Sequence, residues 1–440
     1  MQRRKRYVQV GLGARSLCYT ETLVKTMRAE CELVGICDNN QGRLELRNRH
    51  IVEKLKGRPV PAYPDTQFDR MIREQKPDVV VVTSKDSTHD KYIVRAMQLG
   101  CDVVSEKPMT IDEKKCQRIV DAANKTKRRI TVTFNCRYMP PMMQVKKLLM
   151  SGVIGKILSV DLRWMLDVHH GASYFRRWHA EKKSSGGLLI HKATHHFDLV
   201  NWFLSANPVE VFAMGARRFY GAQSDMPGRL GLKGHAQRCL DCRLRKKCRF
   251  FFDLKNDKPC NELYLACEKY DGYVYDRCVF GKGIDIEDTM NLVVRYDSGA
   301  FLSYSLNAFT PWEGYQFAFN GSKGRIEFDH IGGAIGGGKM PGSIPQGDHI
   351  RVYPHFKPAI NIPTKFGKGG HGGGDDAFMK DIFSLHPPKD ALMRAANYAG
   401  GAMSVLIGTA ANISMRTNKA VRLDRLVRGL PKPKLPPMPG

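Results

Sequence analysis

The chain has 440 residues, of which 42% are hydrophobic and 26% are charged. This length accommodates two domains with sizeable cores, and the composition is that of an ordinary globular protein. No apolar run reaches the roughly 18 residues that a membrane span needs. The basic residues at the start are not followed by the apolar core of a signal peptide. We therefore expect a cytoplasmic protein that does not associate with membranes.

The charge is strongly basic, because 70 lysines and arginines face 43 acidic residues and leave a net charge of +27. Such an excess is typical of proteins that bind nucleic acids, anionic surfaces or anionic small molecules. Basic residues cluster at 3–6, at 238–258 and after Arg416. No helix-turn-helix, zinc-finger or RNA-module signature accompanies them. We expect no specific nucleic-acid partner, and an anionic substrate or a solvated surface accounts for the charge.

The first 135 residues alternate short apolar runs with helix-like segments. Strands are expected at 7–10, 33–37, 78–83, 102–105 and 130–134, with helices between them, as at 22–29, 41–54 and 93–99. The run at 78–83 is almost pure valine, which is typical of a strand buried on both faces. This pattern predicts a Rossmann domain over residues 1–135, with ligands bound beyond the carboxyl ends of its strands.

The pattern changes after residue 135 to that of an α+β domain with a mainly antiparallel sheet, expected over 136–420. Strands are expected at 158–166, 212–216, 290–296, 299–308 and 316–328, and helices at 188–204 and 391–414. Glycine-rich stretches at 332–347 and 367–374 predict loops. Residues 421–440 form a basic, proline-rich tail that cannot be helical throughout.

Six cysteines crowd into a basic insertion expected at about 225–285. They are Cys239, Cys242, Cys248, Cys260, Cys267 and Cys278. One C-x2-C pair followed by further cysteines is compatible with a four-thiolate zinc or iron–sulfur site, with disulfides in an exported protein, or with free thiols. The spacing matches no standard motif, so the sequence leaves the metal content of the insertion open.

The segment from Gly11 to Ser16 follows the first strand and opens a helix. Glycines at this place let the backbone approach a pyrophosphate. Asp38 ends the second strand, where an acid that binds ribose hydroxyls belongs, and its charge repels the 2′-phosphate of NADP. The pattern predicts NAD as the cofactor, although Arg43 is of the type that accommodates a 2′-phosphate.

Glu106-Lys107-Pro108 follows a strand of the first domain, so Lys107 faces the expected ligand crevice. A lysine there can bind a substrate hydroxyl or transfer a proton. Together with the segments at 11–15, 83–89 and 135–138, this tripeptide makes the chain resemble the Gfo/Idh/MocA oxidoreductases. These include glucose–fructose oxidoreductase and inositol dehydrogenase. Further likeness lies at 151–155, 186–188 and 321–325. The resemblance implies a Rossmann domain followed by an open-faced antiparallel sheet, and association into dimers or tetramers.

The resemblance also implies a second catalytic motif on a helix, with an acid, a histidine four residues later and an aspartate three after that. Here these places hold His191, His195 and Asp198, so a histidine replaces the usual acid. We expect Lys107, His195 and His191 to be catalytic. Histidines four residues apart also suit zinc, but no third ligand is evident.

The expected cofactor-binding residues are Gly11, Gly13, Ala14, Arg15, Ser16, Asp38, Asn39, Arg43, Thr83, Ser84, His89, Glu106, Lys107 and Asn135. The expected substrate-binding residues are Lys107, Arg137, Tyr138, Arg177, Trp178, His179, Lys192 and His195. Aromatic rings in the second set can stack on a sugar, and its arginines can bind hydroxyl or acid groups.

These residues predict an NAD-dependent oxidoreductase that acts on a hydroxyl of a sugar, sugar derivative or polyol. An alternative is an NAD-dependent glycoside hydrolase that uses transient C3 oxidation, elimination and re-reduction, since the chain has more histidines near the motif than oxidation needs. A third interpretation is a nucleotide-sensing or nucleic-acid-binding protein that has kept the fold, and the presence of both Lys107 and His195 argues against it.

Overall fold

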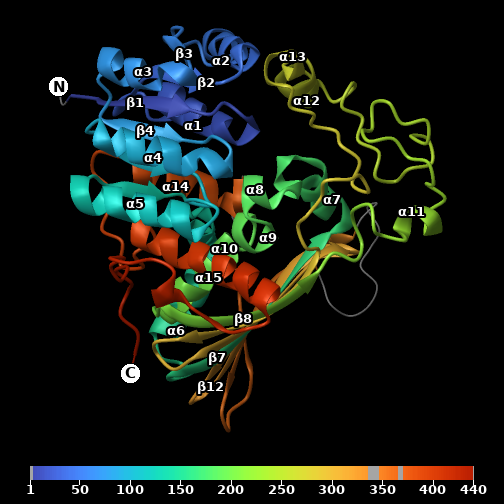
Figure 1. Cartoon of the computed structure of the whole chain (residues 1–440). Helices are drawn as coiled ribbons and strands as arrows, with labels where there is room; N and C mark the ends of the chain where they lie inside the picture. Colours follow the sequence, from blue (N-terminus) through green and yellow to red (C-terminus); the bar gives the residue numbers. More distant parts are fainter. Residues whose placement is uncertain (1–2, 335–345, 365–369, 440) are drawn as a thin grey trace.

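The computed structural model describes residues 3–334, 346–364 and 370–439 (Figure 1). The glycine-rich loops predicted at 332–347 and 367–374 lie in part outside these ranges. The predicted fold class is confirmed, because a mostly parallel sheet with helices precedes a large, mainly antiparallel sheet. No described helix has both the length and the apolar character that crossing a membrane requires.

The first sheet has seven strands in the order β15-β6-β5-β4-β1-β2-β3. The strands are β1 (Lys5–Val10), β2 (Cys31–Asp38), β3 (Ala62–Pro64), β4 (Val79–Val82), β5 (Asp102–Ser105), β6 (Ile130–Val132) and β15 (Ala396–Asn397). The strands β1 to β6 run parallel, and β15 pairs antiparallel with β6. All four valines of β4 are buried, as a strand covered on both faces requires.

Helices join these strands and cover the sheet. They are α1 (Leu17–Glu21), α2 (Gln41–Glu53), α3 (Phe68–Gln75), α4 (His89–Gln98) and α5 (Glu113–Thr126). The helix expected at 22–29 begins earlier, since α1 continues directly into a π-helical turn at Thr22–Thr26.

The second sheet has nine strands in the order β14-β13-β12-β11-β7-β10-β9-β8-β16. The strands are β7 (Ile157–Asp167), β8 (Pro208–Ala216), β9 (Thr289–Tyr296), β10 (Phe301–Thr310), β11 (Trp312–Gly321), β12 (Gly324–Ala334), β13 (Gly347–Pro354), β14 (Ile360–Ile362) and β16 (Val421–Arg422). Within it, β7 and β10 are parallel neighbours and the other pairs are antiparallel. Burial alternates along β9 and β10, so one face packs inward while the other exposes Val293 and Phe301.

The inward face of the large sheet carries the helices that lead to the first domain (Figure 1). They include α6 (Pro140–Met150), α7 (Val168–Arg176), α8 (Lys182–Ser185), α9 (Leu188–His191), α10 (Thr194–Leu204) and α15 (Tyr398–Thr417). A further helix, α14 (Gly374–Phe383), packs against the first domain through Phe378 and Phe383.

Three predicted elements have different bounds in the structure. The helix expected at 188–204 is divided into α9 and α10, because the chain turns at Lys192 and Ala193. The strand expected at 316–328 is a hairpin of β11 and β12, whose turn lies between Gly321 and Gly324. The helix expected at 391–414 begins only at Tyr398, since Asn397 caps it and the preceding residues pair with β6.

An excursion over residues 217–288 joins β8 to β9 and contains short helices only. They are α11 (Met226–Arg229), α12 (Lys258–Cys260), a π-helical turn at Asn261–Leu265 and α13 (Glu268–Asp271). Figure 1 shows this excursion, in yellow-green, reaching from the end of the large sheet to α2 in the first domain. A buried carboxylate, Asp276, holds it together by accepting from Arg238 at 2.6 Å and from the Leu240 amide at 2.7 Å.

The cysteines of this excursion carry no disulfide, since all twelve cysteines of the chain are free thiols. Four of them, Cys239, Cys242, Cys248 and Cys278, line one small cavity. As the side chains are placed, no three His, Cys, Asp or Glu residues in the described ranges surround a point as metal ligands would.

The contact between α15 and α9 predicts a stability effect. A Cβ at Gly408 would lie 2.3 Å from the Leu189 carbonyl oxygen, whereas a Cβ at Gly400 in the same helix would meet nothing closer than 3.7 Å. We expect Gly408→Ala to destabilise the protein by about 1–3 kcal/mol through overpacking. Gly400→Ala should be neutral or stabilising, because alanine has the higher helix propensity. Thermal melting of both variants measures the difference, and equal melting temperatures would contradict the packing argument.

Candidate active site

A cavity of about 690 Å³ opens where the carboxyl ends of the parallel strands face helices α7 and α9. All the expected cofactor-binding residues line it, together with six of the expected catalytic and substrate-binding ones. Those six are Arg177, Trp178, His179, His191, Lys192 and His195, and Lys107 belongs to both sets. The carboxyl ends of parallel strands meet at one edge of a sheet, which explains why loops distant in sequence converge here.

The loop after β1 passes very close to the loop after β4. Gly11 has φ +87°, and a Cβ on it would lie 2.3 Å from Ser84 Cα. Only glycine fits both the left-handed backbone and this close approach. The following turn, Ala14–Ser16, is held by Ser16, whose side chain donates to the Gly13 carbonyl at 2.5 Å. The loop therefore presents bare backbone to the cavity, as a phosphate-binding loop requires.

Asp38 lies at the end of β2 and is 5% exposed. Its carboxylate accepts from the Leu12 amide at 2.6 Å and from the Asn40 amide at 2.9 Å, so it braces the phosphate loop. Burial raises the pKa of Asp38 above its usual value. Arg43 lies 3.8 Å from the carboxylate but makes its shorter ion pair, at 2.8 Å, with Asp271 of the excursion.

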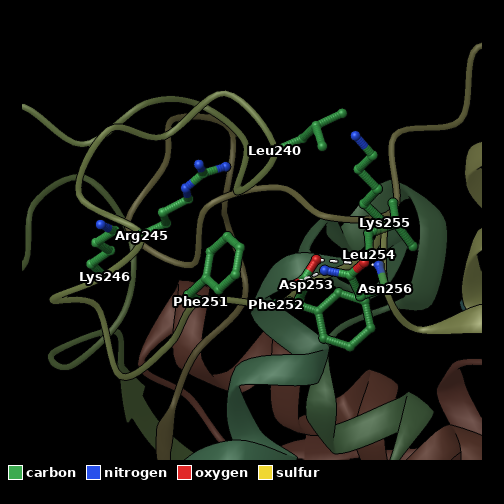
Figure 2. Close-up of a pocket in the computed structure, with 9 residues that line it drawn as sticks. All are labelled: Leu240, Arg245, Lys246, Phe251, Phe252, Asp253, Leu254, Lys255 and Asn256. Atoms are coloured by element: carbon green, nitrogen blue, oxygen red, sulfur yellow. Dashed lines mark hydrogen bonds between the residues drawn. The ribbon is translucent and has the colours of Figure 1, made fainter.

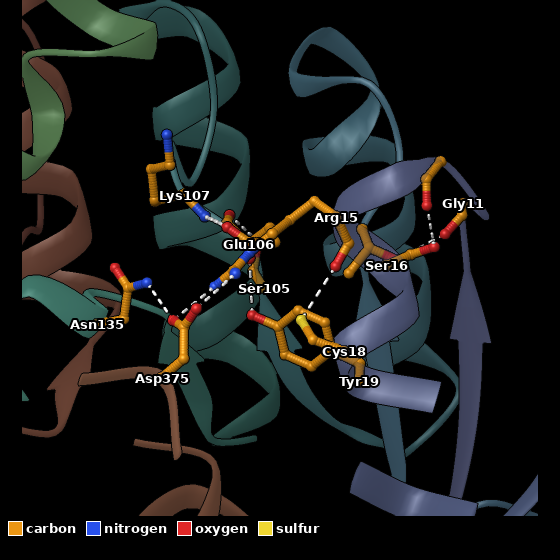
Figure 3. A network of polar contacts seen from close by, with 12 residues as sticks. Gly11, Arg15, Ser16, Cys18, Tyr19, Ser105, Glu106, Lys107, Asn135 and Asp375 are labelled. Carbon is orange, nitrogen blue, oxygen red and sulfur yellow. Dashed lines mark hydrogen bonds and ion pairs between the residues drawn. The ribbon is translucent and has the colours of Figure 1, made fainter. Parts of the chain in front are cut away.

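Glu106 follows β5 directly and is the centre of a buried network (Figure 3). Its carboxylate accepts from Arg15 Nε at 2.8 Å, from the Tyr19 hydroxyl at 2.8 Å and from the Lys107 amide at 3.0 Å. Burial alone would raise the pKa of Glu106, but the charges of Arg15 and Lys107 outweigh burial and hold that pKa below its usual value. Glu106 is therefore an anion that fixes the backbone immediately before Lys107.

The same network reaches α14 of the second domain. Arg15 binds Asp375 through both terminal nitrogens, at 3.1 and 3.2 Å, and Asn135 Nδ2 donates to Asp375 at 2.5 Å. Figure 3 shows these contacts meeting between the first strand and α14. Arg15 and Asn135 were expected to bind the cofactor, and in the structure they also join the two parts of the chain.

The predicted catalytic residues lie on the opposite side of the cavity. Lys107 Nζ donates to the His191 carbonyl at 3.2 Å. His191 Nδ1 lies 2.5 Å from Asp86 Oδ2, so a carboxylate from the loop after β4 orients the ring. Burial lowers the pKa of His191 well below its usual value and raises the pKa of Asp86. His195, 6% exposed, lines the same cavity and packs edge-on against Phe134.

Aromatic and histidine side chains form the remaining wall. The rings of Trp178 and His179 stack with centroids 3.7 Å apart, and His179 lies 4.1 Å from the His191 ring. His170 Nε2 is 3.0 Å from the Tyr174 hydroxyl, and its Nδ1 is 2.9 Å from Glu313. Such a wall combines flat apolar faces with hydrogen-bonding edges, which suits a sugar ring.

Two expected substrate-binding residues do not line the cavity. Arg137, 3% exposed, forms a two-point ion pair with Asp198 at 2.6 and 2.7 Å. Tyr138, 1% exposed, donates to Asp381 at 2.5 Å. Arg137 turns toward the buried carboxylate of Asp198 and Tyr138 toward the half-buried carboxylate of Asp381, because an unpaired arginine or hydroxyl in the interior would be costly. The structure therefore places them as supports of the core and not in the site.

Sequence reasoning missed several residues that line the cavity. Asp86 lies within the segment at 83–89 that supported the resemblance, so its place after a buried strand was a usable signal. Tyr264, Asp271 and Tyr273 come from the cysteine-rich excursion, and no sequence pattern indicated that this excursion returns to the first domain. Tyr174 and His170 also line the cavity, and their contact with it depends on the packing of α7.

The site fits a dinucleotide. Gly13 leaves room beside the backbone, Asp38 offers a carboxylate to ribose hydroxyls, and Arg43 Nη2 is a buried donor without a hydrogen-bond partner among the described residues. Comparison with known protein families also indicates a dinucleotide-binding domain. Residues 5–134 match the family model described as oxidoreductase family, NAD-binding Rossmann fold, and residues 146–423 match its C-terminal alpha/beta domain.

The chain belongs to the Gfo/Idh/MocA oxidoreductase family. It is 36% identical to the protein YteT of Bacillus subtilis over 96% of this chain and 98% of that protein. It is 26% identical to an inositol 2-dehydrogenase/D-chiro-inositol 3-dehydrogenase of Lactiplantibacillus plantarum and to a glycosyl hydrolase family 109 protein of Shewanella baltica. These two matches cover 44% and 46% of this chain and 51% and 45% of those proteins, so they span about half of each.

Solved structures share the fold of this Gfo/Idh/MocA protein. The WlbA dehydrogenase of Bordetella pertussis, in complex with NADH and UDP-GlcNAcA, has a TM-score of 0.61 at 19% identity, over 96% of this chain and 99% of that chain. The aldose-aldose oxidoreductase of Caulobacter crescentus has a TM-score of 0.60 at 18% identity, over 96% and 100%. The protein is thus an NAD(P)-dependent oxidoreductase with an NAD-binding Rossmann domain.

The surroundings of Asp38 predict a preference for NAD over NADP. A 2′-phosphate at the ribose would face two carboxylates, Asp38 and Asp271, while Arg43 is already paired. We expect NAD to bind at least about tenfold more tightly, which corresponds to about 1.4 kcal/mol. Calorimetric titration with each dinucleotide measures this ratio, and tighter binding of NADP would contradict it.

Proposed function

We propose that this oxidoreductase acts on a hydroxyl group of a sugar, a sugar derivative or a polyol, with NAD as its cofactor. The observation that carries the proposal is the convergence of Lys107, His191 and His195 on the cavity that also contains the phosphate loop and Asp38. A lysine and a histidine at one hydroxyl suffice for alcohol oxidation, because one group positions the oxygen while the other accepts its proton.

Lys107, His195 and His191 have different roles in this reaction. Lys107, fixed by Glu106 behind it, donates to the substrate oxygen and stabilises the negative charge that develops there. His195 accepts the hydroxyl proton, and His191, which lies beside Lys107 and whose ring Asp86 holds, orients the substrate. When bound, NAD accepts the hydride from the carbon that carries this hydroxyl. The residues supply position and charge, which are the main sources of rate in such a reaction.

The charge around this end of the cavity favours an acidic sugar. Lys85, Lys107, Arg177 and Lys192 line it, against the carboxylate of Asp86. Burial lowers the pKa of Lys192 and of Lys85, and a bound anion beside them would favour their charged forms. An anionic substrate would supply the missing charge. The complex of the WlbA dehydrogenase with UDP-GlcNAcA supports the same class.

The catalytic assignment predicts the effect of two substitutions. Lys107→Ala and His195→Ala should each lower turnover by about 10²- to 10⁴-fold, the usual contribution of a positioned proton-transfer group. NAD affinity should stay within a few-fold, since neither side chain supports the phosphate loop. Steady-state kinetics on an identified substrate and NAD titration test the two statements. Near-normal turnover of the His195 variant would show that this histidine is structural.

The contact between Asp86 and His191 predicts a positioning effect. Asp86→Asn should lower kcat by about ten- to a hundredfold, as losses of partners that orient a functional histidine do. It should also change the pH–rate profile, because Asp86 and the His191 ring are hydrogen-bonded and change protonation together. Asp69→Asn, an exposed change on α3, is the control. A lower kcat with an unchanged pH profile would indicate a purely structural role.

A second candidate function is redox-neutral cleavage of a glycosidic bond, favoured by the extra histidines His170 and His179 on the wall. Such cleavage needs a base for the C2 proton and an acid for the leaving group besides the groups that serve oxidation. The glycosyl hydrolase family 109 relatives support it. Assays with free sugars and aryl glycosides separate the two. Net NADH formation on an intact sugar supports oxidation, and aglycone release with solvent deuterium at C2 and no NADH supports cleavage.

A further inference from the structure

The cysteine-rich excursion forms part of the cofactor end of the cavity. Residues 258–275, which we name the strap, lie against the start of α2 in the first domain (Figure 1). Asn40 Nδ2 donates to the Cys267 carbonyl at 2.9 Å, and Arg43 Nε donates to the Leu263 carbonyl at 3.4 Å. These contacts join residues more than 200 positions apart in the sequence.

The strap approaches α2 as closely as packing permits. A Cβ on Gly42 would lie 2.7 Å from the Tyr270 ring and 2.9 Å from Cys267 Sγ. Any larger side chain at position 42 would therefore push the strap away from the helix. The fit is that of a built interface between the excursion and the Rossmann domain.

Arg43 is enclosed by strap residues on several sides. Its guanidinium pairs with Asp271 at 2.8 Å and lies 5.8 and 6.0 Å from the ring centroids of Tyr264 and Tyr273. The Arg43 side chain is 10% exposed, and Asp271 is 9% exposed. Arg43, Tyr264, Asp271 and Tyr273 all line the cavity, close to Asp38. The strap thus supplies a wall beside the carboxylate that binds ribose.

Tyr264 also reaches the phosphate loop. Its hydroxyl oxygen accepts from the Ala14 amide at 3.2 Å. In loops of this kind, backbone N–H groups are the donors that a pyrophosphate uses. If a phosphate oxygen accepts from the Ala14 amide instead, the Tyr264 hydroxyl lies beside that oxygen. The hydroxyl can then donate to the phosphate by rotating its O–H bond, without movement of the ring.

We propose that residues 258–275 are a cofactor strap that closes over bound NAD, with Tyr264 donating to the pyrophosphate and Asp271 determining the preference for NAD. Asp271 neutralises Arg43 and adds a second negative charge beside Asp38, so a 2′-phosphate finds no free cation there. Because the strap must leave the loop before the dinucleotide does, it also slows release of the cofactor. The proposal rests on NAD binding and is independent of which hydroxyl is oxidised.

Two substitutions in the full-length protein test the two roles. Tyr264→Phe removes one hydrogen bond to a charged group and should raise the NAD dissociation rate about tenfold or more. Asp271→Asn frees Arg43 and should lower the ratio of NADP to NAD dissociation constants about tenfold. Stopped-flow fluorescence of NADH displacement measures the rates, and calorimetry with NAD and NADP measures the constants.

The matched control is Asp253→Asn in the same excursion. Figure 2 shows Asp253 bonded to Asn256 at a separate cavity of about 460 Å³ that no strap residue lines. This variant should leave rates and constants unchanged. Hydrogen exchange of residues 258–275 provides a readout without substitution, and NAD should slow it at least several-fold.

The proposal that the strap closes over NAD would be overturned by an unchanged NAD dissociation rate in Tyr264→Phe. It would also be overturned if NAD did not alter hydrogen exchange of residues 258–275. An unchanged cofactor ratio in a folded Asp271→Asn variant would overturn the specificity role. Circular dichroism and melting establish that the variants are folded. Failure of the proposed function would appear differently, as NAD binding with intact strap behaviour but no turnover of any sugar or polyol.

Discussion

The buried carboxylate of Glu106 is the contact on which the geometry of the site depends. It accepts from the phosphate loop through Arg15, from α1 through Tyr19 and from the backbone of Lys107. Arg15 continues to Asp375 on α14, so the network also ties the second domain to the first. A buried anion with three donors is rigid because each lost donor would leave charge uncompensated in the interior. Glu106 therefore fixes the position of Lys107 relative to the phosphate loop.

The replacement of an acid by His191 changes how the site handles protons. A histidine at this place needs a partner to fix its ring, and Asp86 supplies it from a different strand end. The carboxylate next to this position is thus supplied by Asp86, from the loop after β4, and Asp86 and His191 both line the cavity. Because Asp86 and His191 are both buried and hydrogen-bonded to each other, their protonation is coupled: a change of charge on one alters the pKa of the other.

The cysteine-rich excursion links the large sheet to the Rossmann domain from outside. Its base is fastened by Asp276 and Asp288, which accept backbone amides of the excursion, and its far end packs on Gly42 and Arg43. Apolar residues of the excursion, among them Phe250 and Phe280, join the hydrophobic core, while buried carboxylates satisfy the backbone of a segment with little regular structure. The excursion therefore contributes residues to the cofactor end of the cavity while the sheet domain contributes the substrate end.

The sequence by itself determined the fold class and brought Gly11, Asp38 and Lys107 to one cavity, because each lies at or just after the end of a parallel strand and such strand ends share one edge. Local pattern carries that information. The tertiary structure decided where side chains turn after the strands end: Arg137 and Tyr138 turn inward to Asp198 and Asp381, whereas Asp86 turns to His191. It also decided that Tyr264 meets Ala14 across 250 positions. Contacts of this range depend on how whole elements pack, which the spacing of residues along the chain does not encode.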